Sequence, residues 1–118
     1  MAPDQPDQWI ADGLYALALS RRSDLASQCK SDAYCREGRH LSFWRKDGVV
    51  AYSLQGPIAV LPAEYRDSAA DFRRMWTEAG TVESIEQAFE LLVYWIFEGK
   101  EVDELPPRAV RRNGISGV

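Results

Sequence analysis

The fold is decided by one run of residues near the middle of the chain: His40-Leu41-Ser42-Phe43-Trp44-Arg45-Lys46-Asp47-Gly48-Val49-Val50-Ala51-Tyr52-Ser53-Leu54. Its two halves are rich in aromatic and β-branched residues, which favour strands. Between them, Asp47-Gly48 is the dipeptide typical of a two-residue hairpin turn. The run therefore predicts an antiparallel hairpin with strands at 40–46 and 49–54.

The alternation of side chains along the first strand places Leu41 and Phe43 on one face and Trp44 on the other. If Leu41 and Phe43 point into the core, Trp44 is exposed beside Lys46 and is a candidate anchor for a partner. A shift of one residue in the pairing would invert the two faces and bury Trp44. The sequence leaves both arrangements open.

Downstream of the hairpin, the pattern predicts one more strand and then a helix. Gln55-Gly56-Pro57 reads as a turn, and Ile58–Leu61 as a short third strand that Pro62 ends. A helix over 63–78 follows, with Gly80 as its C-terminal glycine. Its apolar face is formed by Tyr65, Phe72, Met75 and Trp76.

A last helix is predicted to start at Thr81, with Ser84 and Gln87 as an alternative capping pair one turn later. Gly99-Lys100 is typical of a helix end. The run Leu91–Phe97 is apolar on every side of this helix. Such a segment is either buried in the core or exposed as a surface for a partner or for self-association.

Upstream of the hairpin, an N-terminal helix is predicted to begin near Asp7 or Gln8 and to end between Ser20 and Lys30. Its apolar stripe consists of Ile10, Leu14, Leu17 and Ala18. The polar residues 31–39 are predicted to form a loop. At the other end, residues 106–118 combine proline, arginine and glycine and are expected to be a loosely ordered tail.

Together these segments predict an α+β fold: an N-terminal helix, a three-stranded antiparallel meander, two C-terminal helices and an extended tail. Residues 1–105 form the single predicted domain. The length of 118 residues and the content of 46% hydrophobic and 27% charged residues are typical of one folded domain.

The seven residues of Leu91–Phe97 are far fewer than the roughly twenty that span a bilayer. The N-terminal residues also lack the pattern of a secretory signal, so we expect a cytoplasmic protein without a membrane role.

Catalytic and metal-binding patterns are missing from the sequence. The chain has one histidine, His40, and two cysteines, Cys29 and Cys35. These three residues match no common zinc spacing and lack a fourth ligand, so we expect no metal and two free thiols. No nucleotide-binding glycine motif and no nucleophile motif occur, and we therefore expect a binding protein without a cofactor and not an enzyme. A small enzyme would require a pocket that collects His40, Cys35 and a carboxylate.

The charge distribution suggests the kind of partner. Residues 47–104 carry twelve acidic and four basic side chains within a chain of net charge −4. This excess argues against nucleic acid as the main ligand, because phosphate binding needs clustered lysine and arginine. It favours a basic protein partner through electrostatic complementarity. The same acids would also suit the solvated faces of two helices.

In three features the chain resembles small bacterial immunity proteins. These proteins are encoded beside polymorphic toxins of contact-dependent or type VI secretion systems. The three features are the Phe43–Gly48 hairpin, the acidic helix from Thr81 to Glu98, and the run Glu101–Pro106. The resemblance is one of architecture and charge over residues 40–115. It implies a protein that neutralises a cognate toxin by stoichiometric binding, with acidic side chains that block a basic active site. The residues so implied are Glu83, Glu86, Glu90, Glu101, Asp103 and Glu104.

The alternative function is that of an adaptor or secretion chaperone, which would hold a partner helix through the apolar Leu91–Phe97 surface.

Overall fold

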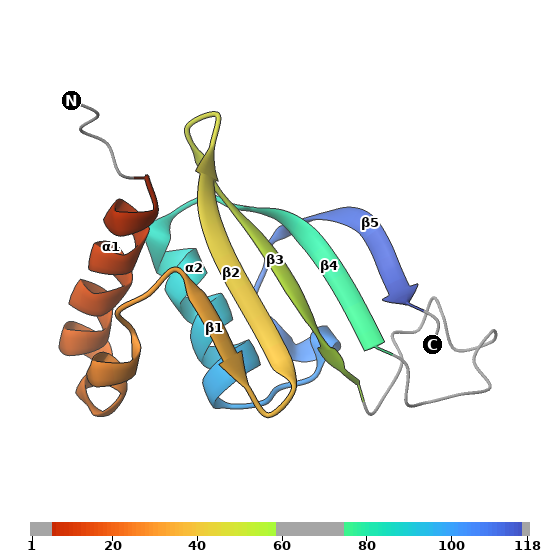
Figure 1. The fold of residues 1–118 in the computed structure, drawn as a ribbon, viewed down its shortest axis with the longest axis horizontal. Coiled ribbons are helices and arrows are strands. Elements are labelled where there is room, and N and C mark those ends of the chain that lie inside the picture. The colour runs from red at the N-terminus through yellow and green to blue at the C-terminus, as the bar shows by residue number, and fades with distance from the viewer. Residues whose placement is uncertain (1–5, 59–74, 117–118) are drawn as a thin grey trace.

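The computed structural model describes residues 6–58 and 75–116. They form one five-stranded antiparallel sheet in the order β1-β2-β3-β4-β5, in which each strand pairs with its neighbours in sequence. Figure 1 shows α1 beside the β1 end of the sheet and α2 across one sheet face. The α+β class is therefore confirmed, although the sheet is larger than the expected three-stranded meander.

The predicted hairpin is present as β2 (Arg39–Lys46) and β3 (Val49–Pro57). Asp47 and Gly48 connect them with φ values of 52° and 82°, the left-handed geometry that a two-residue turn of this kind requires. Leu41 and Phe43 are 1% and 2% exposed, so they point into the core. Trp44 consequently points away from the core, and of the two registers the sequence left open this one is observed.

The prediction that residues 31–39 form a loop is wrong. This segment contains the edge strand β1 (Ala33–Arg36). Glu37 and Gly38, both with positive φ, form a second two-residue turn into β2. Of the four strand residues, only Tyr34 is partly covered. An edge strand with one covered side chain has no apolar alternation, so the sequence pattern did not reveal it.

The predicted turn at Gln55-Gly56-Pro57 is also wrong, because β3 runs through it to Pro57. The lack of a side chain at Gly56 allows the Trp95 ring to pack closely against β3, since a Cβ at this position would lie 2.8 Å from Cζ2 of Trp95. Ile58 is buried but lies outside the strand, and the rest of the predicted third strand at 58–61 lies outside the described residues.

Most of the predicted helix over 63–78 likewise lies outside the described residues. Its last four positions are wrong, because Met75–Val82 form β4 in the middle of the sheet. Gly80 does not end a helix. It pairs with Tyr52 on one side and Val110 on the other, and a side chain there would collide with the backbone of Ala109.

In the described segments, two helices and three helical turns accompany the sheet. The predicted first helix is confirmed as α1 (Pro6–Arg21), which is followed by the 3-10 turn η1 (Ser23–Gln28). The second helix, α2 (Ile85–Leu92), starts at the alternative position and not at Thr81: the Ser84 side chain accepts a hydrogen bond from the Gln87 N–H. It continues as the π-helical turn η3 (Val93–Phe97), which ends before Gly99, and the 3-10 turn η4 (Val102–Glu104) follows.

The run Leu91–Phe97 belongs to the core. Leu91, Leu92 and Trp95 are completely buried, Val93 and Ile96 nearly so, and Tyr94 and Phe97 are partly covered. They pack between Leu14 of α1 and the sheet residues Leu41, Phe43 and Leu54.

The expectation of a loosely ordered tail over 106–118 is wrong for most of its length. Ala109–Ser116 form β5, an edge strand that pairs with β4. Its pairing shifts register between Thr77 and Ala79, which indicates a β-bulge. The shift breaks the regular alternation by which a strand is recognised in a sequence.

Candidate functional site

Three of the predicted partner-binding residues lie together on the outer side of α2. Its inner side is formed by the buried residues Ala88, Phe89, Leu91 and Leu92. Glu86 and Glu90, one helical turn apart, are exposed on the opposite side, and Glu83 is exposed just before the N-cap. None of the three forms an ion pair with another residue of the described segments. We call these three residues the α2 carboxylates.

The other predicted acids form a separate group after the end of the helix. In the turn around η4, Oε1 of Glu104 accepts a hydrogen bond from the Glu101 N–H at 2.9 Å, and Glu101 pairs with Arg39 at 3.8 Å. These two carboxylates therefore stabilise the local structure, and Asp103 is exposed beside them. The length of α2 and η3 separates the group from Glu83, so the six acids do not form one continuous cluster.

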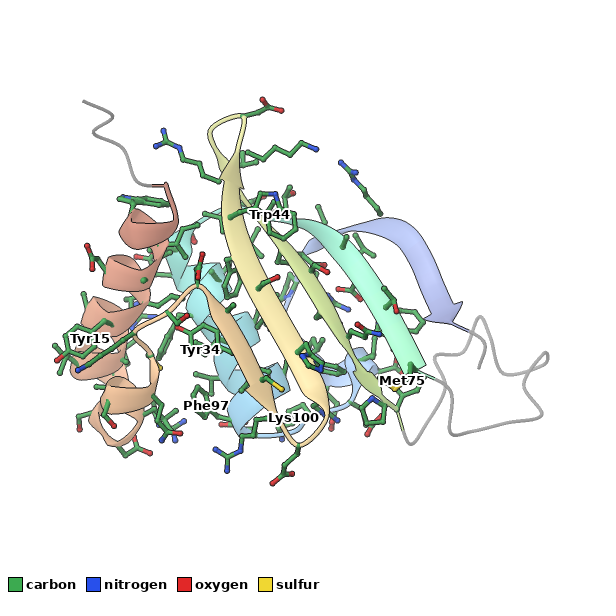
Figure 2. The ribbon with its side chains drawn as sticks, viewed as in Figure 1. Tyr15, Tyr34, Trp44, Met75, Phe97 and Lys100 are labelled. Carbon is green, nitrogen blue, oxygen red and sulfur yellow. The ribbon has the colours of Figure 1, made fainter. Side chains whose placement is uncertain are left out.

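Trp44 is not part of either acidic group. It is 36% exposed on the sheet face opposite α2, where Figure 2 shows it in front of the sheet. Its neighbours on this face include the exposed side chains of Lys46 and Val49. A single flat partner surface cannot contact both Trp44 and the α2 carboxylates, because the sheet lies between them.

A groove adjoins the α2 carboxylates at the end of α1. It encloses about 300 Å³ and is lined by Arg21, Arg22, Phe89, Glu90, Val93, Tyr94 and Glu98. Arg22 is paired within the molecule, with Asp24 at 3.0 Å and with Glu98 at 3.6 Å. Glu90 therefore lies at the rim of a concavity that has an apolar floor.

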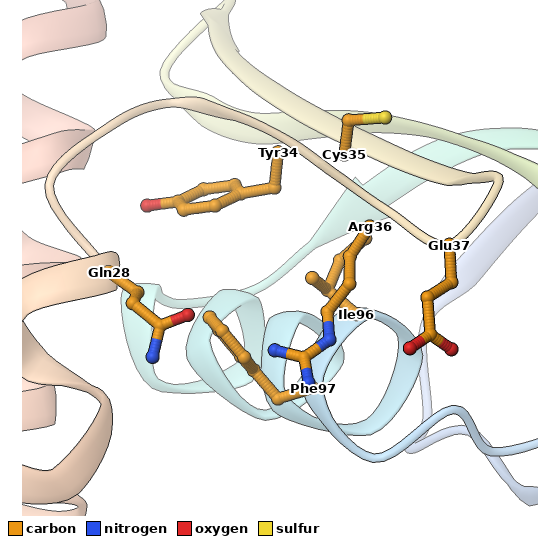
Figure 3. Close-up of a pocket in the computed structure, with 7 residues that line it drawn as sticks. All are labelled: Gln28, Tyr34, Cys35, Arg36, Glu37, Ile96 and Phe97. Atoms are coloured by element: carbon orange, nitrogen blue, oxygen red, sulfur yellow. The ribbon is translucent and has the colours of Figure 1, made fainter.

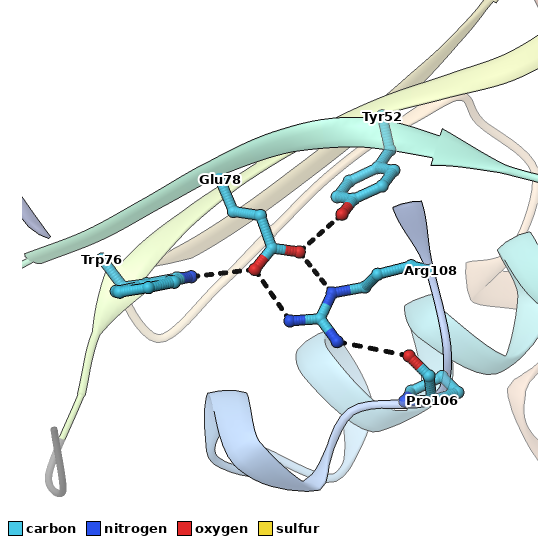
Figure 4. A network of polar contacts seen from close by, with 5 residues as sticks. All are labelled: Tyr52, Trp76, Glu78, Pro106 and Arg108. Carbon is cyan, nitrogen blue, oxygen red and sulfur yellow. Dashed lines mark hydrogen bonds and ion pairs between the residues drawn. The ribbon is translucent and has the colours of Figure 1, made fainter. Parts of the chain in front are cut away.

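The sequence did not predict that the carboxylate of Glu78 on β4 is buried, with this residue only 1% exposed. Figure 4 shows the four side chains that meet there. Glu78 accepts hydrogen bonds from the Tyr52 hydroxyl at 2.5 Å, from Nε1 of Trp76 at 3.0 Å and from Nη2 of Arg108 at 2.7 Å. It also accepts a hydrogen bond from Nε of Arg108, which makes the ion pair bidentate.

This network keeps Glu78 charged inside the core. Burial alone raises the pKa of Glu78, but the hydrogen bonds from Arg108 and Tyr52 outweigh it and hold the pKa below its ordinary value. Burial raises the pKa of the Tyr52 hydroxyl, and the neighbouring carboxylate raises it further. Tyr52 therefore stays protonated as a hydrogen-bond donor. Because each buried polar side-chain atom of the cluster has a partner, the cluster is suited to hold β3, β4 and the start of β5 together and not to exchange protons with a ligand.

A second unpredicted cluster ties the β1–β2 hairpin to the end of η3. The Arg39 guanidinium lies 4.0 Å from the centre of the Trp95 ring and donates to the backbone carbonyls of Trp95, at 3.3 Å, and Lys100, at 2.5 Å. Nε1 of Trp95 in turn donates to the backbone carbonyl of His40 at 3.1 Å. The first of these bonds reaches a carbonyl in η3, where helix-terminal carbonyls lack a partner within the helix, and the other two reach carbonyls of a loop and of β2.

A cavity of about 330 Å³ lies beneath β1, between this strand and η3. Figure 3 shows Tyr34 and Arg36 on the side of the strand that faces Phe97, whereas the Cys35 side chain points to the opposite side. The Cys35 thiol instead lies 3.9 Å from Nε2 of His40 on the outer face of the sheet. Cys35 and Glu37 line the cavity but His40 does not, so the cavity does not combine Cys35, His40 and a carboxylate.

Within residues 6–58 and 75–116, no three histidine, cysteine or acidic side chains gather as a metal site would require. Both cysteines are free thiols, Cys29 buried and Cys35 exposed. No helix in the same segments is long and apolar enough to cross a membrane.

No family model matches the chain, and no curated protein or solved structure matches it either.

Proposed function

We propose that this protein is an immunity protein of a bacterial toxin system, which neutralises a cognate toxin in the cytoplasm by direct stoichiometric binding. The proposed surface is the outer side of α2 with its three carboxylates. The observation that carries the proposal is that these side chains are exposed and have no ion-pair partner among the described residues. They form no ion pair that holds the described segments together, so a basic partner can contact them.

The electrostatics of this helix support a basic partner. Residues 83–99 contain four acidic and no basic side chains. A surface of one sign attracts a partner of the opposite sign over a distance comparable to the Debye length, which is about 8 Å at physiological salt. Like-charged proteins are repelled, so the surface adds selectivity as well as speed of association.

The groove beside Glu90 supports the same location. Binding energy in protein interfaces is concentrated in a few side chains that enter pockets, often those of aromatic residues and arginine. An arginine from a partner could place its aliphatic part against the partly covered Tyr94 and its guanidinium at Glu90. Trp44 and the Glu101–Glu104 group lie elsewhere, so they are not part of the proposed surface.

An adaptor or secretion chaperone would need Leu91–Phe97 as an exposed surface for a partner helix. Five of the seven residues of Leu91–Phe97 are buried in the core and cannot receive a partner helix without unfolding.

The test is protection of cells from the product of the adjacent reading frame upstream. We expect growth to be restored when this chain is co-expressed with that protein, and the two to form a complex of fixed stoichiometry. Glu86→Lys and Glu90→Lys should each weaken the complex by about tenfold or more, because each reverses a charge in the interface. Growth arrest that is equal with and without this chain would refute the immunity function.

Glu37→Lys is the matched control. Glu37 is also an exposed glutamate, but it lies in the β1–β2 turn. This variant carries the same change in net charge and should bind like the wild type. If all three variants bind equally well while protection persists, the function stands and the α2 surface is wrong.

A further inference from the structure

The residues Cys35 and His40 form a pair of side chains that the proposed function does not use. They lie directly opposite each other in the register of β1 and β2. The Phe43 N–H donates to the Asp32 carbonyl, and hydrogen-bonded pairs recur at every second position of an antiparallel ladder. Cys35 and His40 therefore occupy a non-hydrogen-bonded pair, the position at which opposite side chains come closest.

The pair is open to solvent and points away from the core. Both residues are exposed, and the thiol lies 3.9 Å from Nε2 of the imidazole. The charged residues next to them in sequence face the other way: Arg36 lies over the Phe97 ring and Arg39 over the Trp95 ring. The next residue across the sheet is the uncharged Gln55, which pairs with His40. Of the described groups, His40 is thus the one placed to accept the thiol proton.

The second cysteine provides an internal comparison. Cys29 is completely buried at the end of η1, and this burial raises the pKa of its thiol. A thiol reacts through its thiolate, so Cys29 should be inert in the folded protein. The chain therefore holds one exposed thiol beside an imidazole and one buried thiol.

We propose that Cys35 is a site of reversible S-thiolation by low-molecular-weight disulfides, with His40 as the group that accepts the thiol proton. Imidazole is the side chain that exchanges protons most readily near neutral pH. The proton passes from Sγ of Cys35 to Nε2 of His40, and the thiolate attacks one sulfur of the disulfide. A new Sγ–S bond forms as the S–S bond of the reagent breaks. The departing thiolate takes up a proton, so one disulfide is consumed and one thiol is released.

The open position explains the choice of a small reagent. Cys35 is exposed at the edge of the open cavity beneath β1, and its side chain points away from Phe97. A compact disulfide can reach its sulfur in line without displacing a core residue. Because the product would extend into solvent, the modification should leave the fold intact.

The experiment uses the full chain with oxidised glutathione at neutral pH, followed by intact-mass measurement and peptide mapping. We expect one adduct per chain, located on Cys35, absent in Cys35→Ser and removed by dithiothreitol. Addition of denaturant should make Cys29 react as well, which shows that the reagent detects both thiols.

His40→Gln tests the role of the imidazole. It keeps the backbone carbonyl that accepts the Trp95 hydrogen bond but removes the base. The initial rate of adduct formation should fall by at least about threefold, since the group that accepts the thiol proton is removed. Gln55→Ala, on the other side of His40, should react at the wild-type rate, and the thermal melting of each variant verifies that the fold is retained. An adduct on Cys29 in the native protein, or a smaller rate change in His40→Gln, would overturn the proposal.

Discussion

Glu78 and the α2 carboxylates are chemically the same groups, yet the structure uses them in opposite ways. Glu78 is buried and accepts four hydrogen bonds from three side chains. Glu83, Glu86 and Glu90 are exposed and have no ion-pair partner in the described part of the chain. A charge that has lost its water must be compensated by the protein, whereas an exposed charge is already solvated. The buried carboxylate therefore supports the fold, and the exposed ones are free to serve an interaction.

The largest effect is expected from breaking the buried pair. Glu78→Gln leaves the Arg108 charge, whose side chain is only 12% exposed, without its counter-ion. Loss of one partner of such a pair costs about 3–5 kcal/mol, a large part of the stability of a small domain. Urea unfolding followed by tryptophan fluorescence measures this loss.

The double variant Glu78→Leu with Arg108→Met is the companion measurement. It removes both charges, so it should be more stable than Glu78→Gln. If the double variant is less stable than Glu78→Gln, the hydrogen bonds of the network contribute to the free energy of unfolding beyond the mutual compensation of the two charges.

The second effect is a dependence of stability on pH that originates from Glu78. The pKa of Glu78 in the folded protein lies below its ordinary value of 4.5. Its contribution is therefore fully present above about pH 4.5 and is lost as the pH falls through the lower, folded value. The difference in unfolding free energy between wild type and Glu78→Gln should thus narrow in acid. A difference that stays constant from pH 7 to pH 3 would contradict a charged Glu78.

An intermediate case lies between the buried and the exposed carboxylates. Glu104 is exposed, but it accepts a hydrogen bond from the Glu101 N–H in the turn around η4. Glu104→Ala should cost about 0.5–1 kcal/mol, as the loss of a capping interaction does. Glu104→Gln keeps an acceptor oxygen and should retain most of the stability in the same unfolding experiment.

The smallest effect is expected for the α2 carboxylates. Replacement of Glu86 or Glu90 by glutamine should change the unfolding free energy by less than about 0.5 kcal/mol. The loss of a favourable interaction of Glu86 with the helix N-terminus is offset by relief of repulsion between the two charges. Thermal unfolding at low salt measures the change. A loss above about 1 kcal/mol would mean that these residues support the fold after all.

The errors in the sequence-based fold have physical causes. The hairpin was predicted correctly because Asp47-Gly48 determines its geometry locally and the flanking strands show strong β preference. Strand β1 was missed because only one of its side chains is partly covered, so it has no apolar alternation. Strands β4 and β5 were missed because their formation depends on neighbours that are distant in sequence. Met75 and Trp76 fit a helical spacing as well as a strand, and only pairing with β3 and β5 decides between them.

The same limit applies to the candidate site. The exposed position of Glu83, Glu86 and Glu90 follows from the helical spacing of the apolar residues around them. That Glu101 pairs with Arg39, and that Trp44 lies on the far side of the sheet, depends on how distant segments meet. Spacing in a sequence can assign a residue to a face of its own element, but it cannot show which elements share a surface.

By itself, the sequence determined the α+β class, the Asp47-Gly48 hairpin, the N-terminal helix and the polar outer side of α2. Each of these follows from interactions between residues close along the chain. The tertiary structure alone decided the five-stranded sheet, the burial of Leu91–Phe97 and the charged network of Glu78 with Arg108. Strand pairing and desolvation involve partners from distant parts of the chain, and these partners are not specified by local pattern.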